Sequence, residues 1–164
     1  MKKHPFMTTL LFILVIIISL IIYNNSLNTV NVPSNVIENI VKNDLEPTAG
    51  VKSFGGKVFC DYSIVISEEK YGEINVYLWL YSQELYVDSN QIKSGTGTID
   101  PAVLHLKKEN STYALKDFYI STEAAGSDSM RKFPIRVRNK FKSNNYNFSY
   151  DTKLYDRAKE YFKI

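Results

Sequence analysis

The sequence predicts an α+β fold: an N-terminal transmembrane helix, then a helix packed on a curved antiparallel sheet of about four to five strands, then a C-terminal amphipathic helix. Three observations predict it. An uncharged apolar run fills residues 6–23, alternating apolar segments follow one another between 57 and 121, and apolar residues recur at helical spacing on both sides of that block. We expect a membrane anchor over 1–23, a linker over 24–32, an α+β domain over 33–142 and a basic amphipathic helix over 143–164.

The apolar run is long enough to anchor the chain in a bilayer. As a helix, residues 7–23 extend about 26 Å, against about 30 Å for the hydrocarbon core. Lys2 and Lys3 precede the run, so the positive-inside rule places the N-terminus in the cytoplasm and the domain outside it. Residues 20–25 contain no small-residue cleavage site, which favours a retained, single-pass anchor in the cell membrane. Secretion after signal cleavage is the alternative.

Composition excludes several classes of site. Cys60 is the single cysteine, so no internal disulfide forms, and with two histidines it cannot supply the ligands of a common zinc site. We therefore expect no metal and no cofactor. The sequence carries no nucleic-acid-binding motif, and nucleic acid is not an expected partner in the expected compartment. An oligomeric state is not predicted.

A short amphipathic helix is expected after the linker. Ser34 is placed to cap its first turn, and Pro47 ends it. Five apolar residues recur with a spacing that puts them on one helical face: Val36, Ile37, Ile40, Val41 and Leu45. A short helix with one apolar face needs a sheet to cover.

Four strands are expected to form that sheet, over 57–67, 73–87, 101–109 and 112–121, because these segments are rich in β-branched and aromatic residues. The short turns between them predict an antiparallel meander. The stretch 94–98, Ser-Gly-Thr-Gly-Thr, is expected to be a small-residue loop or bulge.

Three aromatic residues, Tyr77, Trp79 and Tyr81, line one face of the expected central strand. An aromatic ladder of this kind can grip a peptide or a sugar, and these three residues are the candidate ligand-binding residues. The alternative is that the ladder packs against the C-terminal segment, with three aromatic partners there: Tyr155, Tyr161 and Phe162.

The charge is unevenly distributed. Residues 31–130 carry 8 basic and 14 acidic side chains, a net charge of −6, whereas residues 131–164 carry 10 basic and 3 acidic ones, a net charge of +7. One helical turn is expected over 127–132, and the pattern over 135–142 does not decide between helix and strand. The terminal helix places four basic residues beside its apolar stripe, and these are the candidate membrane or polymer contacts: Lys153, Arg157, Lys159 and Lys163. The alternative is that this helix docks on the acidic body of its own domain.

Several segments together resemble a group of small anchored or secreted proteins of Gram-positive bacteria. They are Gly72–Trp79, Ser94–Gly97 with Pro101–Leu104, Tyr113–Lys116, Gly126-Ser127 and Met130–Pro134. The resemblance covers roughly residues 55–135, and it implies a helix packed on a curved antiparallel sheet, similar to cystatin-like or NTF2-like domains. The chain departs from the pattern at 123–125 and extends past Pro134 with the basic helix. The resemblance implies no catalytic residues.

No convincing catalytic set is present, and none of the residues is expected to be catalytic. His105 would act as a general base if Asp61 or Asp117 oriented it, which keeps a small hydrolase or isomerase as the alternative function. A strand histidine without a catalytic role is the plainer interpretation. We expect a single-pass, membrane-tethered extracytoplasmic domain with a non-enzymatic binding or sensory role at the cell envelope. Its partners would be the membrane, through residues 7–23, and an envelope protein or anionic wall polymer.

Overall fold

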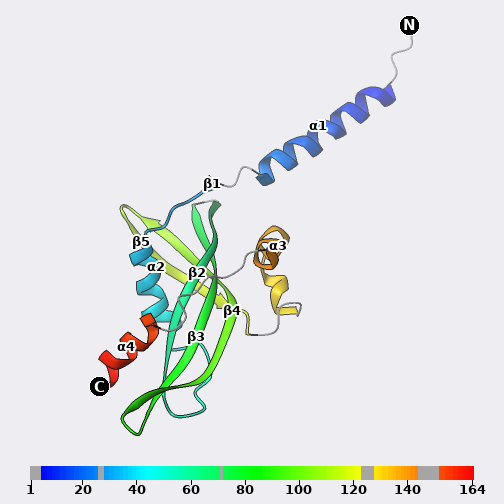
Figure 1. The fold of residues 1–164 in the computed structure, drawn as a ribbon. Coiled ribbons are helices and arrows are strands. Elements are labelled where there is room, and N and C mark those ends of the chain that lie inside the picture. Colours follow the sequence, from blue (N-terminus) through cyan, green and yellow to red (C-terminus); the bar gives the residue numbers. More distant parts are fainter. Residues whose placement is uncertain (1–4, 26–27, 71, 123–127, 144–151) are drawn as a thin grey trace.

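The computed structural model confirms an α+β protein built on one antiparallel sheet (Figure 1). It describes residues 5–25, 28–70, 72–122, 128–143 and 152–164. Four long strands lie in chain order, beside a two-residue strand at one edge: β1 (Asn28–Thr29), β2 (Lys57–Lys70), β3 (Glu73–Asp88), β4 (Gln91–Glu109) and β5 (Thr112–Ile120). The remaining elements are helical: α1 (Pro5–Asn25), α2 (Ser34–Ile40), η1 (Val41–Leu45), η2 (Asp128–Lys132), α3 (Ile135–Ser143) and α4 (Thr152–Phe162).

Short turns make the predicted meander. Gly72 joins β2 to β3 with a φ of 78°, and Ser89 and Asn90, with φ of 51° and 63°, join β3 to β4. Asn110, with a φ of 57°, joins β4 to β5. Glycine and asparagine adopt positive φ with little strain. Two consecutive residues with positive φ, as at Ser89 and Asn90, match the twist of antiparallel strands.

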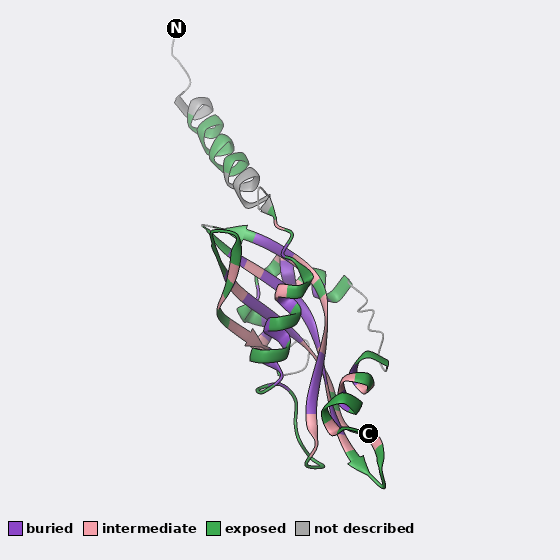
Figure 2. Cartoon of the chain, turned by 90° about the vertical axis from the view of Figure 1, so that its left-hand side faces the viewer, coloured by how far each residue is buried: buried purple, intermediate pink, exposed green. Residues whose placement is uncertain are grey.

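Helices cover both faces of the sheet. On the first face, side chains of β3 such as Leu78 and Leu80 pack against Ile37 and Leu45 of α2 and η1. On the second face, the alternate residues of β3 pack against η2 and α3. The buried residues accordingly run along the middle of the long strands in Figure 2. A strand that is apolar on both sides is therefore central, as its sequence predicted.

The first-face helix differs from the prediction at its start. It begins at Ser34, but Pro33 is the capping residue, and no side chain caps the helix by a hydrogen bond. The predicted apolar stripe is buried from Ile37 to Leu45, and Val36 is half-buried. The helix continues into a π-helical turn in which the Glu46 N–H donates to the Val41 carbonyl at 2.9 Å.

Strand β4 also differs from the prediction. It starts at Gln91, ten residues before the expected start at 101, and so runs through the stretch 94–98, which was expected to be a loop or bulge. The expected bulge is present within this stretch: Gln83 pairs with Gly97 and Leu85 with Ser94, so β4 has one residue more than β3 between these pairs. The physical reason is space: Gly95 and Gly97 have no side chains, and the carboxylate of Glu84 and the amide of Gln83 occupy the room that a Cβ would fill.

The N-terminal helix α1 stands apart from the sheet (Figure 1). The structure describes its side chains for residues 9–19, and nine consecutive large apolar ones, Leu10 to Ile18, are 46–70% exposed. Among the described residues, no helix is both long enough and apolar enough to cross a membrane.

Candidate functional site

The aromatic ladder of β3 lies inside the protein. Tyr77 and Trp79 are 5% and 8% exposed, and the Trp79 ring meets Phe141 of α3 edge-on at 5.0 Å. Phe133 contacts Tyr77 in the same way at 6.3 Å. Burial raises the pKa of the Tyr77 hydroxyl to about 12, and the nearby Glu68 carboxylate adds to the shift. These rings are thus core residues under α3 and present no open groove.

The partners of the ladder are not those expected from the sequence. Helix α4 packs mainly on Phe59 of β2, where the rings of Tyr161 and Phe162 lie 6.0 and 6.5 Å from the Phe59 ring. Tyr81, which is half-buried, contacts both the α3 cluster and the α4 cluster. The covering segment does come from the C-terminal part of the chain, but η2, α3 and the residues between them supply most of it.

His105 does not form a dyad with Asp61. Its Nδ1 lies 2.6 Å from the side-chain oxygen of Asn75 on the neighbouring strand. Asp61 pairs through Tyr81 with Ile99, six residues along β4 from His105, which separates the two by roughly 20 Å. Asp117 is the cross-strand neighbour of His105 on β5, but its carboxylate is exposed and accepts the Phe118 N–H at 2.8 Å.

Two of the four candidate basic residues of α4 bind acidic residues elsewhere in the domain. Lys153 lies 3.2 Å from Glu38 of α2 and 3.9 Å from Asp61 of β2. Arg157 forms a salt bridge with Glu46, and its side chain is 21% exposed. Lys159 pairs with Asp156 on its own helix at 3.3 Å, and Lys163 follows the helix as an exposed residue. The basic helix therefore docks on the acidic body of its own domain.

Glu46 and Arg157 together bind the outward backbone groups of one residue on the edge of β2. The Cys60 N–H donates to the Glu46 carboxylate at 3.0 Å, and Nη1 of Arg157 donates to the Cys60 carbonyl at 3.0 Å. Burial raises the pKa of the Cys60 thiol, and the negative charge of Glu46 raises it further. Cys60 is therefore a protonated thiol inside the core and not a nucleophile.

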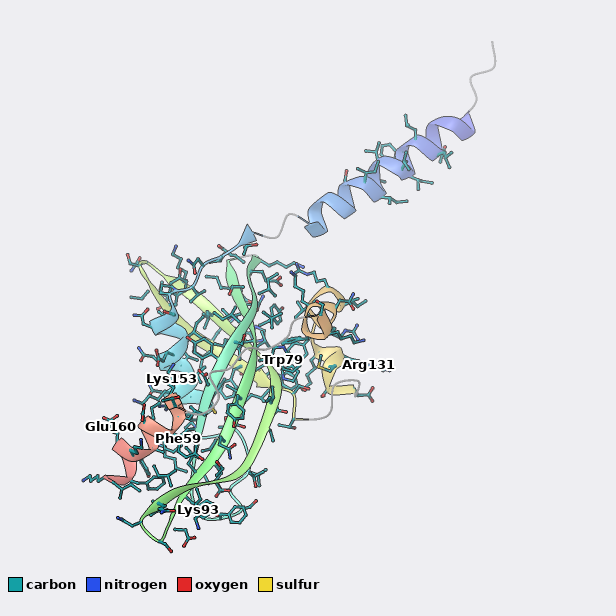
Figure 3. All side chains as sticks on the ribbon, viewed as in Figure 1. Phe59, Trp79, Lys93, Arg131, Lys153 and Glu160 are labelled. Atoms are coloured by element: carbon teal, nitrogen blue, oxygen red, sulfur yellow. The ribbon has the colours of Figure 1, made fainter. Side chains whose placement is uncertain are left out.

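A charged groove lies on either side of this salt bridge. One cavity, of about 200 Å³, lies between α2, β2 and α4, and a second, of about 240 Å³, lies between η1, β2 and the end of α4. Both are lined by Lys42 and Arg157, so they adjoin. Figure 3 shows Lys153 and Glu160 along α4, with Phe59 beside the helix. We call these two cavities the Arg157 groove.

The cations that face the Arg157 groove include two that sequence reasoning missed. Lys42 of η1 lines both cavities, and Lys57 of β2 lines the second, with its amine 4.1 Å from the centre of the Tyr161 ring. The carboxylates of Glu38, Asp61 and Glu46 are bound by Lys153 and Arg157. The four cations of the groove are thus balanced by four carboxylates once Glu160 is counted, and Lys42 and Lys57 are the two that form no salt bridge among the described residues. Nothing in the sequence indicated that Lys42 and Lys57 face one groove, because the helical turn and the strand end that carry them meet only in the folded chain.

A second organised feature is a loop held by a buried carboxylate. Glu84 is fully buried, and its carboxylate accepts the backbone N–H groups of Ser53, Phe54 and Gly56 at 2.8–3.0 Å. Burial acts to raise the pKa of Glu84, but these hydrogen bonds hold it below its ordinary value of 4.5. The loop presents Phe54, which is 58% exposed and stacks on Tyr86 at 5.0 Å.

No group of three or more metal-ligating side chains occurs among the described residues. No protein-family model, curated protein or solved structure matches the chain. The resemblance to small anchored or secreted Gram-positive proteins therefore stays a prediction, and the site has to be interpreted from its own geometry.

Proposed function

We propose that the protein is a single-pass, membrane-tethered binding domain that works at the outer face of the cell envelope without catalysing a reaction. One observation carries the proposal: α1 stands apart from the sheet and exposes nine consecutive large apolar side chains. Apolar surface of this extent is costly in water, and hydrocarbon is the environment that covers it on all sides. Lys2 and Lys3 before the run favour a cytoplasmic N-terminus.

We further propose that the domain is of the cystatin-like or NTF2-like kind. The order of elements supports this, because α2 precedes a four-strand antiparallel meander and covers one of its faces.

The Arg157 groove is the surface that we assign to binding, and its ligand would be an anionic group of an envelope polymer. Lys42 and Lys57 supply the positive charge, and the ring of Tyr161 lies under the Lys57 amine. Arg157 and Lys153 line the groove and are held in fixed positions by salt bridges to their acidic partners. Such a site selects ligands by their negative charge, and its affinity for them falls as the salt concentration rises.

The tether is tested by fractionation and topology. The full chain should remain with membranes after extraction at high pH, and a phosphatase fused to the C-terminus should be active in the periplasm of a reporter bacterium. Replacing Ile13 and Ile17 by Asp should release the chain, because a charge in the hydrocarbon core costs about 2.5–3.5 kcal/mol per residue. A fusion that is active only in the cytosol would overturn the proposal.

Binding is tested with polyphosphate as the anionic probe and dextran as the neutral one. The double variant Lys42→Glu, Lys57→Glu should lose polyphosphate binding, and added salt should weaken the binding of the unchanged chain. The matched control is Lys107→Glu, Lys108→Glu, which makes the same change of charge on exposed residues beside the β4–β5 turn. Equal loss in both variants would mean that only net charge matters and that the groove is not the site.

A further inference from the structure

One stretch of the chain is strongly basic. Residues 128–143, which form η2 and α3, carry one carboxylate and six cations: Arg131, Lys132, Arg136, Arg138, Lys140 and Lys142. Helix α3 buries Val137 and Phe141 against the sheet, so the helical period places Ile135 and Asn139 in the middle of its outer side and its four cations on the two flanks. Ile135 is 69% exposed. We call the surface made by the six cations and Ile135 the α3 basic face.

Most of the charge of the α3 basic face is not neutralised. Arg131 lies 3.2 Å from the one carboxylate of its own segment, and Arg136 forms a salt bridge with Glu68. The other four cations form no salt bridge within the described ranges. The residues outside those ranges contain two carboxylates, Glu123 and Asp151, so at most two further cations can find a partner there. The α3 basic face therefore carries a net positive charge.

The α3 basic face lies at the end of the domain to which α1 is connected. Arg136 binds Glu68, and the partner of Glu68 in the sheet is Thr29 of β1. Helix α1 ends at Asn25, so no more than about 14 Å of chain separates it from Thr29. Figure 1 accordingly shows α3 in the half of the domain that carries β1, whereas α4 lies in the other half, nearer the β3–β4 turn.

We propose that the α3 basic face binds the phosphate groups of anionic phospholipids in the membrane that holds α1, an inference that rests on the proposed tether. Each Lys or Arg near an anionic lipid surface strengthens attachment by about fivefold. Ile135 is a large apolar side chain between cations, which suits the boundary between headgroups and hydrocarbon. A hydrophilic wall polymer offers Ile135 no such environment, and this favours lipid as the occupant.

The test places the full chain in lipid nanodiscs of phosphatidylcholine, with or without phosphatidylglycerol, in which some lipids carry a spin label on the headgroup as a quencher. A fluorophore on Asn139→Cys reports on the α3 basic face, and one on Gln91→Cys reports on the β3–β4 turn at the opposite end. Cys60 is buried, so the label does not reach it. We expect strong quenching at residue 139 only with phosphatidylglycerol, weaker quenching at high salt, and little quenching at residue 91.

Removal of charge separates α3 from α4. Lys140→Gln with Lys142→Gln should lower the ratio of docked to undocked chains by about 30-fold, since two cations are lost. The matched control is Lys159→Gln with Lys163→Gln, which removes the same charge from exposed residues at the end of α4 and should leave the quenching unchanged. Equal quenching in both lipids, quenching in neither, or an equal loss in both double variants would overturn the proposal.

The remaining outcomes separate the α3 basic face from the tether and from a polymer site. If the chain does not enter nanodiscs, the tether fails, and flotation of the chain with vesicles of the same two lipid compositions tests α3 alone. Retention on phosphatidylglycerol vesicles should then be lost in Lys140→Gln with Lys142→Gln, and equal retention of this variant and the unchanged chain would overturn the lipid contact. Loss of polyphosphate binding in this variant without loss of quenching would assign the face to a polymer and overturn the lipid contact as well.

Discussion

The guanidinium of Arg157 binds the carboxylate of Glu46 across 111 positions of sequence, and both groups also bind the backbone of Cys60. One salt bridge thereby fastens α4 to the end of η1 and to the edge of β2. Glu46 is 4% exposed, and Arg157 is the cation that binds this buried carboxylate.

Arg157→Ala is therefore expected to destabilise the fold by about 3 kcal/mol, because it leaves a buried carboxylate without its partner. Urea unfolding of the chain in mild detergent measures the change. Lys159→Ala removes an exposed pair on the same helix and should cost less than about 0.5 kcal/mol. Similar losses for the two variants would contradict the structural role of Arg157.

Glu84 makes stability depend on pH. Its pKa in the folded chain lies below the ordinary value of 4.5, so the unfolded chain binds a proton more readily than the folded one. The carboxylate therefore contributes stability above about pH 4.5, and that contribution is lost as the pH falls through the folded pKa. We expect Glu84→Gln to lower Tm at pH 7, and the difference in Tm from the unchanged chain to shrink between pH 5 and pH 3. A difference that stays constant over this range would show that the charge of Glu84 is not involved.

Gly56→Ala should strongly destabilise the loop that Glu84 holds. A Cβ at this position would lie 2.3 Å from the carbonyl oxygen of Leu85, which is backbone and cannot turn aside. Overpacking of this kind costs about 1–3 kcal/mol. Gly97→Ala is the control, since its nearest obstacle is the end of the flexible Gln83 side chain. Chemical denaturation compares the two, and a larger loss for Gly97→Ala would contradict this reasoning.

Phe133→Ala tests whether the aromatic ladder is core. Phe133 is 1% exposed and contacts Tyr77, Tyr119 and Phe141, so its removal should cost about 3–5 kcal/mol and loosen α3. Tyr161→Ala, at a residue that is 55% exposed, should cost much less. Thermal unfolding followed by near-UV circular dichroism reports both changes. A folded, stable Phe133→Ala chain would mean that α3 does not rest on this cluster.

The strands and the first-face helix could be predicted because their signals are local. Alternation in 73–87 and the stripe from Val36 to Leu45 each follow from a fixed side-chain period, and the structure buries most of the apolar residues in both segments. The segment 135–142 was undecided because it has few apolar residues. Its helix α3 is stabilised by Val137 and Phe141, which pack on the ladder of β3, and this contact is not visible in local spacing.

The site was less predictable because it depends on pairs of distant residues. The uneven charge of the two parts of the chain offered docking of α4 on its own domain as one of two alternatives, yet it could not identify Glu46 as the partner of Arg157. Likewise, the Ser-Gly-Thr-Gly stretch was noticed as irregular, but its role is to accommodate Glu84 from the strand opposite. Complementary charge is a property of the whole sequence, whereas the partner of each charge is decided by the fold.

The connection between α1 and the sheet has a mechanical consequence. Helix α1 ends at Asn25 and β1 begins at Asn28, so two residues separate the helix from a strand that is held by two register pairs. A pulling force on α1 reaches these pairs before any other part of the sheet. Because the pairs would break one after the other, β1 is the element that peels away first under load, while β2 to β5 remain together.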